Sequence, residues 1–149
     1  MVVVVEDLLR LERDTNELRF ELGMPISVNH MYANTRGGGK RPNKAAETYI
    51  RNSRARINVV LEEQEWELTE KGVWLYIDLI FYFPDRVRRD SHNFLKILLD
   101  TLEGKVYQDD MYVMPRIMSV EYDKANPRVE IKIHPQTKEL RNLHINDMM

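Results

Sequence analysis

A basic run, a short amphipathic segment and an acidic pair follow one another between residues 84 and 110. The basic run ends in Asp90, the amphipathic segment carries Lys96 on its polar side, and the acidic pair is Asp109 and Asp110. Carboxylates at both ends of a short helix, with arginines in front of them, favour a hard-cation site that faces a phosphate. These residues are the first candidates for chemistry.

Hydrolysis of a phosphodiester needs a cation that polarises the phosphoryl group, activates water and stabilises the leaving oxygen. Mg²⁺ prefers oxygen ligands and keeps several waters, so a few carboxylates are enough to hold it. Asp90 and Asp110 are the predicted metal ligands, with Asp109 as a further ligand or a support. Lys96 is predicted to neutralise developing charge or to hold the scissile phosphate. Taken singly, Asp90 is explained as a charge at the start of a helix, Lys96 as a surface residue, and Asp109 and Asp110 as a turn. Their joint occurrence favours a metal site.

A helix predicted over residues 91–103 positions these groups, with Ser91 as its N-cap and Gly104 just past its last turn. Its apolar residues recur at helical spacing and should face a core. They are Phe94, Leu95, Leu98, Leu99 and Leu102. The polar residues share another face because residues three and four apart are neighbours on a helix. They are Asn93, Lys96, Asp100 and Glu103.

The residues before this helix predict a strand over 73–83 that is apolar on both faces. Such a strand belongs in the middle of a sheet or has one face covered by a partner subunit. Residues 18–22 predict a half-buried strand, and Asn43 is predicted to cap a helix that runs to about Gln64 with Ala45 toward the core. Residues 113–122 and 128–134 predict an antiparallel pair joined at KANP.

These elements predict the α+β class, with a mixed β-sheet and two main α-helices packed on it. The length of 149 residues predicts one domain, residues 1–149. Residues 1–16 form an extension that is either an edge strand or a helix, and residues 135–149 a tail that is either a short helix or disordered.

The composition is that of an ordinary globular protein, with 31% charged and 43% hydrophobic residues. Cysteine is absent, which removes disulfides, thiolate metal sites and a cysteine nucleophile. No apolar run approaches the ~20 residues of a membrane span. The first residues also lack the basic start of a signal peptide, so no membrane partner and a cytoplasmic location are expected.

Charge is unevenly distributed although the net charge is only −2. Residues 36–56 are strongly basic, and residues 62–70 are strongly acidic. The basic segment suits phosphate binding, and the alternative is a solvated helix whose two halves differ in charge. Its glycine run at residues 37–39 predicts a mobile loop that orders on nucleic acid, and it does not fit a Walker phosphate loop.

The pattern RRD-x-x-N-x-x-K-x-x-x-D-x-L followed by DD resembles the RusA family of Holliday-junction resolvases. The segment PISVNHMY at residues 25–32 resembles a second part of that family, and the order of segments agrees over roughly residues 17–134. The resemblance implies a RusA-like fold, Mg²⁺ or Mn²⁺ as cofactor, a homodimer, and cleavage of branched double-stranded DNA in recombination and repair. The residues predicted to contact DNA are Arg86, Arg88, Arg89, Asn93, Lys40, Arg41 and Lys44.

His92 departs from the family pattern, which has a second Asp at this position. A nitrogen ligand there would shift the metal preference from Mg²⁺ toward Mn²⁺. An imidazole could also act as a base or a phosphate donor near neutral pH, and His92 is therefore a candidate catalytic residue. The remaining alternative is an exposed histidine without a catalytic role.

Two other functions stay open at this stage. The first is a DNA-binding protein that has lost catalysis through the change from Asp to His. The second is a metal-dependent nuclease with RNA or flap substrates, because phosphate contacts do not discriminate between them. A homodimer suits a four-way junction physically, since two symmetric strands must be cut by two identical sites.

Overall fold

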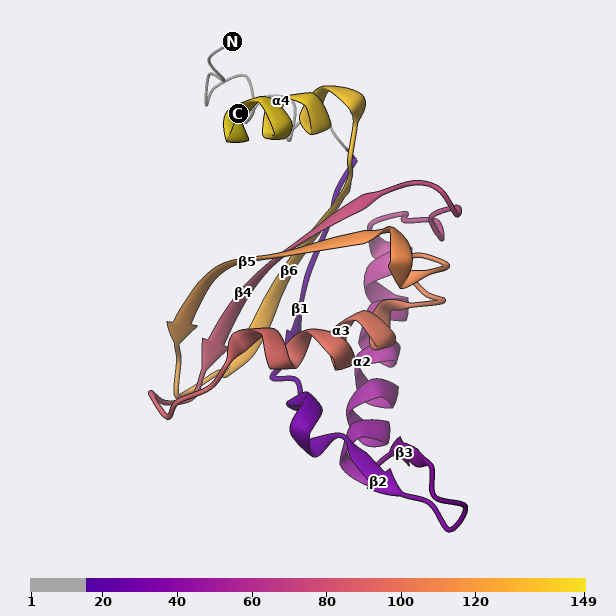
Figure 1. Cartoon of the computed structure of the whole chain (residues 1–149), viewed down its shortest axis with the longest axis vertical. Helices are drawn as coiled ribbons and strands as arrows, with labels where there is room; N and C mark the ends of the chain where they lie inside the picture. Colours follow the sequence, from indigo (N-terminus) through magenta and orange to yellow (C-terminus); the bar gives the residue numbers. More distant parts are fainter. Residues whose placement is uncertain (1–15) are drawn as a thin grey trace.

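The computed structural model describes residues 16–149 as a mixed four-stranded sheet with two helices packed on one face (Figure 1). The strand order is β1–β6–β4–β5, with β4 and β5 parallel and the other neighbours antiparallel. The strands are β1 (Leu18–Gly23), β4 (Leu75–Phe83), β5 (Val113–Tyr122) and β6 (Arg128–Pro135). The remaining elements are the hairpin β2 (Tyr32–Asn34) and β3 (Lys40–Pro42) and the helices α2 (Lys44–Glu63), α3 (Leu95–Leu102) and α4 (Lys138–Met148). The predicted α+β class is confirmed.

Strand β4 lies in the middle of the sheet and pairs on both edges. Its inward side chains are almost fully buried and share one core cluster with residues of β1, β6, α2 and α3. They are Leu75, Ile77, Leu79, Phe81 and Phe83. The predicted central position is confirmed, although the strand begins at Leu75 and not at Val73.

The predicted pairing of residues 113–122 with residues 128–134 is wrong. The link at residues 123–127 reverses the chain direction, but β4 lies between β5 and β6 and pairs with both. The backbone N–H of Asp123 donates to the carbonyl of Phe83 over 2.8 Å, so the link crosses the end of β4. A direct β5–β6 hairpin would leave one edge of the most apolar strand unpaired, which is unfavourable for a buried backbone.

The two helices behind the site largely follow the sequence pattern. Asn43 caps α2 as predicted, since its Oδ1 accepts from the backbone N–H of Ala46 over 2.8 Å. Ala46 is buried and Ala45 is exposed, so the prediction that Ala45 faces the core is wrong by one position. Residues Ser91–Phe94 form a 3₁₀ turn before α3, and Ser91 is therefore inside that turn and not its N-cap. Gly104 has φ +80°, the predicted left-handed conformation after the helix.

The glycine-rich segment, predicted to be a mobile loop, forms the tip of the β2–β3 hairpin. The backbone N–H of Thr35 donates to the carbonyl of Gly39 over 2.8 Å, and Gly38 has φ +84°. A residue at that angle is strained unless it is glycine, so Gly38 permits the tight turn. The hairpin projects away from the sheet at the lower end of the molecule in Figure 1.

The C-terminal tail forms helix α4, so the helical alternative is confirmed. Thr137 Oγ1 accepts from the backbone N–H of Leu140 over 3.1 Å, and Leu140 is fully buried. The strand-or-helix prediction for the first residues lies outside the described residues. Within residues 16–149, no helix is long and apolar enough to cross a membrane.

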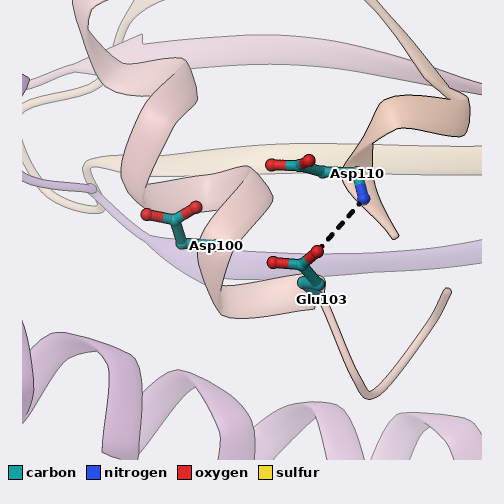
Figure 2. Close-up of side chains that lie close together, drawn as sticks. All are labelled: Asp100, Glu103 and Asp110. Atoms are coloured by element: carbon teal, nitrogen blue, oxygen red, sulfur yellow. Dashed lines mark hydrogen bonds between the residues drawn. The ribbon is translucent and has the colours of Figure 1, made fainter. Parts of the chain in front are cut away.

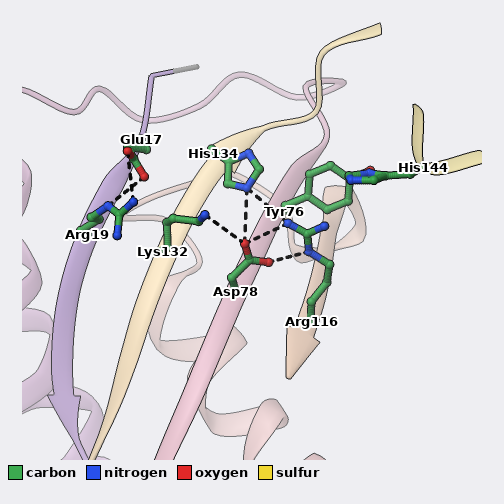
Figure 3. Close-up of polar contacts among 8 residues, drawn as sticks. All are labelled: Glu17, Arg19, Tyr76, Asp78, Arg116, Lys132, His134 and His144. Atoms are coloured by element: carbon green, nitrogen blue, oxygen red, sulfur yellow. Dashed lines mark hydrogen bonds and ion pairs between the residues drawn. The ribbon is translucent and has the colours of Figure 1, made fainter. Parts of the chain in front are cut away.

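The outer face of the sheet carries a polar network centred on Asp78, which is 7% exposed (Figure 3). Arg116 donates to it from two nitrogens, with Nη2 to Oδ2 at 2.9 Å. His134 Nε2 and Lys132 Nζ lie 3.5 and 3.7 Å from the same Oδ2. Burial alone would raise the pKa of Asp78, but hydrogen bonds from His134 and Arg116 and their charges outweigh it and lower the pKa to about 2. The carboxylate is therefore ionised and stabilises the centre of the sheet.

Candidate metal centre and nucleic-acid cleft

The predicted catalytic residues all lie in the connection between β4 and β5. Parallel neighbours in a sheet need a crossover, and here residues 84–112 form it through the 3₁₀ turn, α3 and a second 3₁₀ turn (Asp110–Tyr112). The burial of Phe94, Leu98 and Leu102 fixes α3 on the sheet. The polar side of α3 is thereby turned away from the core.

Three carboxylates meet at the C-terminal end of α3: Asp100, Glu103 and Asp110 (Figure 2). One oxygen from each lies within 4.8 Å of the others, and all three side chains are partly buried. Glu103 Oε1 also accepts from the backbone N–H of Asp110 over 3.3 Å. We call these three residues the carboxylate cluster. Hard divalent cations take such oxygen ligands, so the cluster has the donor chemistry of a Mg²⁺ or Mn²⁺ site.

Arg54 on α2 holds the backbone from which the carboxylate cluster projects. Its Nη2 donates to the carbonyl of Asp100 over 3.0 Å, and its Nε donates to the carbonyl of Thr101 over 3.2 Å. A longer contact of 3.5 Å reaches the carbonyl of Glu103. These carbonyls have no partner in the helix, so the guanidinium satisfies them and adds positive charge at the negative end of the helix dipole.

Lys96 lies one turn before Asp100, and its Nζ contacts Asp100 Oδ1 over 3.0 Å. The hydrogen bond to Asp100 raises the pKa of Lys96, and the charges of Asp100 and Asp110 and the nearby Tyr32 raise it further. The side chain is half exposed and fully protonated at neutral pH. The ammonium can therefore reach both the cluster and a ligand that approaches from solvent.

Asp90 lies at the opposite end of α3 from the carboxylate cluster. It follows the C-terminal end of β4, whereas Asp110 just precedes Val113, which pairs with the first residue of β4. The helical stretch from residue 91 to residue 100 spans about 15 Å. Ligands of one ion lie roughly 2–2.6 Å from it, so Asp90 and Asp110 of a single chain are too far apart to share one.

Asp109 and His92 occupy different surroundings. Asp109 Oδ1 accepts from the backbone N–H of Met111 over 2.9 Å, so its carboxylate caps the 3₁₀ turn that carries Asp110. His92 is exposed on the 3₁₀ turn before α3. In residues 16–149 it belongs to no group of three potential metal ligands.

A polar cleft of about 430 Å³ contains Asp90. One wall is the segment of the predicted motif that ends in Asn93, and the other wall is the 3₁₀ turn Val28–His30 with Ser27 before it. Phe94 also lines the cleft and is otherwise buried against Phe83. The structure thus brings the two segments that resemble the RusA family side by side.

The predicted DNA-contacting cations differ in their partners. Arg89 is paired with Asp85 over 2.7 Å, and this hydrogen bond lowers the pKa of Asp85. Arg86 lies over the ring of Tyr122 at 4.3 Å. Among the described residues, the other side chains have no ion pair and are exposed. They are Arg88 in the cleft and Lys40, Arg41 and Lys44 on the hairpin and the start of α2.

Asp100 and Glu103 are expected from the sequence on the polar face of the helix, but they are not among the predicted metal ligands. Their spacing of three residues and the turn at Gly104 were the available signals, because such a turn can bring a following acid back to the helix end. Arg54 gave no signal, since its contacts are to carbonyl groups that no side-chain pattern reveals.

A sequence model described as endodeoxyribonuclease RusA matches residues 23–134, well over half of the chain. No curated protein matches the chain at a significant level. The match defines the class of the protein as an endonuclease that acts on DNA. The chain belongs to the RusA family of Holliday-junction resolvases, and the resemblance found in the sequence is confirmed.

Proposed function

We propose that this protein is a divalent-metal-dependent endonuclease that resolves four-way DNA junctions in recombination and repair. The observation that carries the proposal is the carboxylate cluster with Lys96 beside it. Its donors are all oxygen, which fits Mg²⁺ and also Mn²⁺. A cation bound there would polarise the scissile phosphoryl group and lower the pKa of a bound water.

The chain's own residues position the substrate around this site. Lys96 is held by Asp100 and offers its ammonium to the scissile phosphate, where it stabilises the charge that develops on the oxygens. Arg88 and the basic residues of the β2–β3 hairpin contact phosphates farther along the DNA. Asp109 supports the site by capping the turn of Asp110.

A homodimer is part of the proposal because Asp90 and Asp110 lie at opposite ends of α3. If both serve one metal, a second copy of the chain must bring its Asp90 to the carboxylate cluster of the first. A two-fold dimer would then contain two identical sites, as a symmetric junction requires. The outer face of β4, with Ile80 and Tyr82 partly exposed, is the proposed interface element.

A cleavage assay tests the proposal and its alternatives. Synthetic four-way junctions, linear duplex, flap DNA and RNA are incubated with the protein and either Mg²⁺ or Mn²⁺. We expect cleavage of the junctions and little cleavage of the other substrates. Binding without cleavage under both metals would indicate a non-catalytic junction-binding protein. Preferential cleavage of flaps or RNA would indicate another substrate class.

Replacement of Lys96 by Ala is expected to slow single-turnover cleavage by on the order of a hundredfold. Stability should change by less than about 0.5 kcal/mol, because the Lys96–Asp100 pair is half exposed. Binding should weaken little, with the salt dependence reduced by about one counterion. The measurement is single-turnover cleavage with saturating enzyme, beside binding titrations at several salt concentrations.

Lys124→Ala is the matched control, since this lysine is exposed in the link between β5 and β6. It should cleave at the wild-type rate. A normal rate with weakened binding in Lys96→Ala would make Lys96 a phosphate contact without a role in the chemical step. Wild-type rate and binding together would remove it from the site.

His92→Asp is expected to increase Mg²⁺-supported cleavage relative to Mn²⁺-supported cleavage, because it restores the carboxylate of the family pattern. His92 is exposed, so the substitution should leave the fold intact. The measurement is the ratio of initial rates in the two metals. His92→Asn is the control, since it removes the imidazole without adding a carboxylate. An inactive His92→Asp protein that is still folded would show that the imidazole has its own role.

A further inference from the structure

Several of the polar side chains that line the cleft beside Asp90 have no partner in the described part of the chain. Arg88, Asn29 and Asn93 line it, and within residues 16–149 their side-chain nitrogens and oxygens make no hydrogen bond or ion pair. His30 lies in the same wall and its ring is likewise unpaired in the described chain. Surface amides are often solvated, but here two amides, an arginine and a histidine line one hollow of about 430 Å³, a size typical of small-ligand sites.

The wall that carries Asn29 is held rigidly. Ser27 Oγ accepts from the backbone N–H of Asn29 over 3.3 Å and caps the 3₁₀ turn. Asn43 then fixes the end of the turn, because its backbone N–H donates to the carbonyl of Met31 over 2.8 Å and its side-chain amide donates to the carbonyl of His30. Met31 is 1% exposed and packs with Ala46 and Ile97 between α2 and α3. The unpaired groups are therefore presented on a preorganised backbone.

The chemistry of the cleft matches one nucleotide. A carboxamide donates and accepts at the same time, which suits the Watson–Crick edge of a base. Phe94 adds an apolar residue to the lining, and Arg88 offers a phosphate a cation that is unpaired within residues 16–149. In duplex DNA the Watson–Crick edges are already paired, so only a nucleotide freed from its partner can use these groups.

We propose that this cleft binds one unpaired nucleotide of the DNA substrate, next to Asp90. Arg88 contacts its phosphate, and the amides of Asn29 and Asn93 contact the edge of its base. The inference rests on the proposed function and deepens it, because it gives the site a means of recognising branch points. Base pairs at the point of strand exchange stand at the ends of duplex arms and open at a lower cost than pairs inside a duplex. The cleft can therefore select both the exchange point and the base that is freed there.

The experiment measures binding, so it does not depend on cleavage. Four-way junctions carry 2-aminopurine at a crossover position, and a series of junctions varies the neighbouring bases. The wild-type protein in Ca²⁺ should increase the fluorescence, as expected for an unstacked base, and should bind the best and worst base sequences with different affinities. Asn29→Ala should reduce the fluorescence change and lower this discrimination by about tenfold. The Asn58→Ala control, exposed on α2, should change neither quantity.

The results separate this inference from the proposed function. An Asn29→Ala protein with unchanged fluorescence and unchanged discrimination would overturn the inference, even if junction cleavage by the wild type is normal. An equal loss of affinity for every base sequence would also overturn it, because that is the behaviour of a phosphate contact. If the wild type binds junctions and shows the base effect but cleaves none, the cleft stands and the nuclease proposal fails. A wild type that does not bind junctions overturns both.

Discussion

Replacement of Asp110 by Asn is expected to abolish junction cleavage, with a loss on the order of a thousandfold or more, while binding stays as tight or becomes tighter. The substitution removes one of the three charges of the carboxylate cluster and keeps the size of the side chain and the backbone hydrogen bond to Glu103. Fewer anionic groups also repel the phosphates less. Single-turnover cleavage and a binding titration measure the two effects.

Asp147→Asn is the matched control, because Asp147 is exposed on α4 far along the chain from the site. It should leave cleavage unchanged. Retained cleavage in Asp110→Asn would contradict the assignment of the carboxylate cluster as the metal site.

Asp90→Asn should be inactive as well, and a mixture of the two inactive variants tests the dimer. In a mixed dimer whose sites combine Asp90 of one chain with Asp110 of the other, one site is intact and the second has lost both carboxylates. We expect the mixture to regain cleavage of one strand per junction. If each site were built within a single chain, every site in the mixture would carry one substitution, and the mixture would stay inactive.

The second large effect concerns stability and comes from the outer face of the sheet. Asp78→Asn is expected to reduce the free energy of unfolding by about 3 kcal/mol at pH 7, because it leaves Arg116 without its counter-charge in a largely buried position. This loss of stability should lie at the low end of the range for broken buried ion pairs, because the Arg116 side chain is 27% exposed and can recover some hydration. Urea unfolding of the variant and the wild type measures the difference.

The same difference should depend on pH. The folded-state pKa of Asp78 is about 2, below the value of ~3.9 for an unfolded aspartate. A lowered pKa means that the ionised form stabilises the fold fully above about pH 4, and that this contribution is lost as the pH falls toward 2. Wild type and Asp78→Asn should therefore converge between these values. A difference that is constant down to pH 2 would contradict the role of the ionised carboxylate.

Much of the local structure could be predicted because it depends on neighbouring residues. The run that is apolar on both faces identifies β4, the Asn43 amide identifies the start of α2, and Gly104 identifies the end of α3. In each case the signal is a side chain acting on backbone within a few residues of itself. The motif residues could be found in the same way, since their spacing is that of one helix and one turn.

The errors arose where distant segments decide the outcome. The chain reversal at residues 123–127 is visible in the sequence. The insertion of β4 between β5 and β6 depends instead on which strand is stabilised most by pairing on both edges. The distance between Asp90 and Asp110 depends on the parallel pairing of β4 with β5. The sequence places Asp90 and Asp110 at the two ends of one predicted helix, but it does not show that the strand after Asp110 runs parallel to β4 and keeps the two acids too far apart to share one metal within a single chain.

The crossover between parallel strands also has a consequence for when the enzyme becomes active. A parallel pair closes only after a long connection has been made and ordered, and such non-local contacts form slowly. The direction in which Asp110 returns toward α3 is fixed by β5, the strand that follows it in the chain. A nascent chain released before β5 is complete thus holds the motif but not its geometry. We expect DNA cutting to begin only with the finished fold.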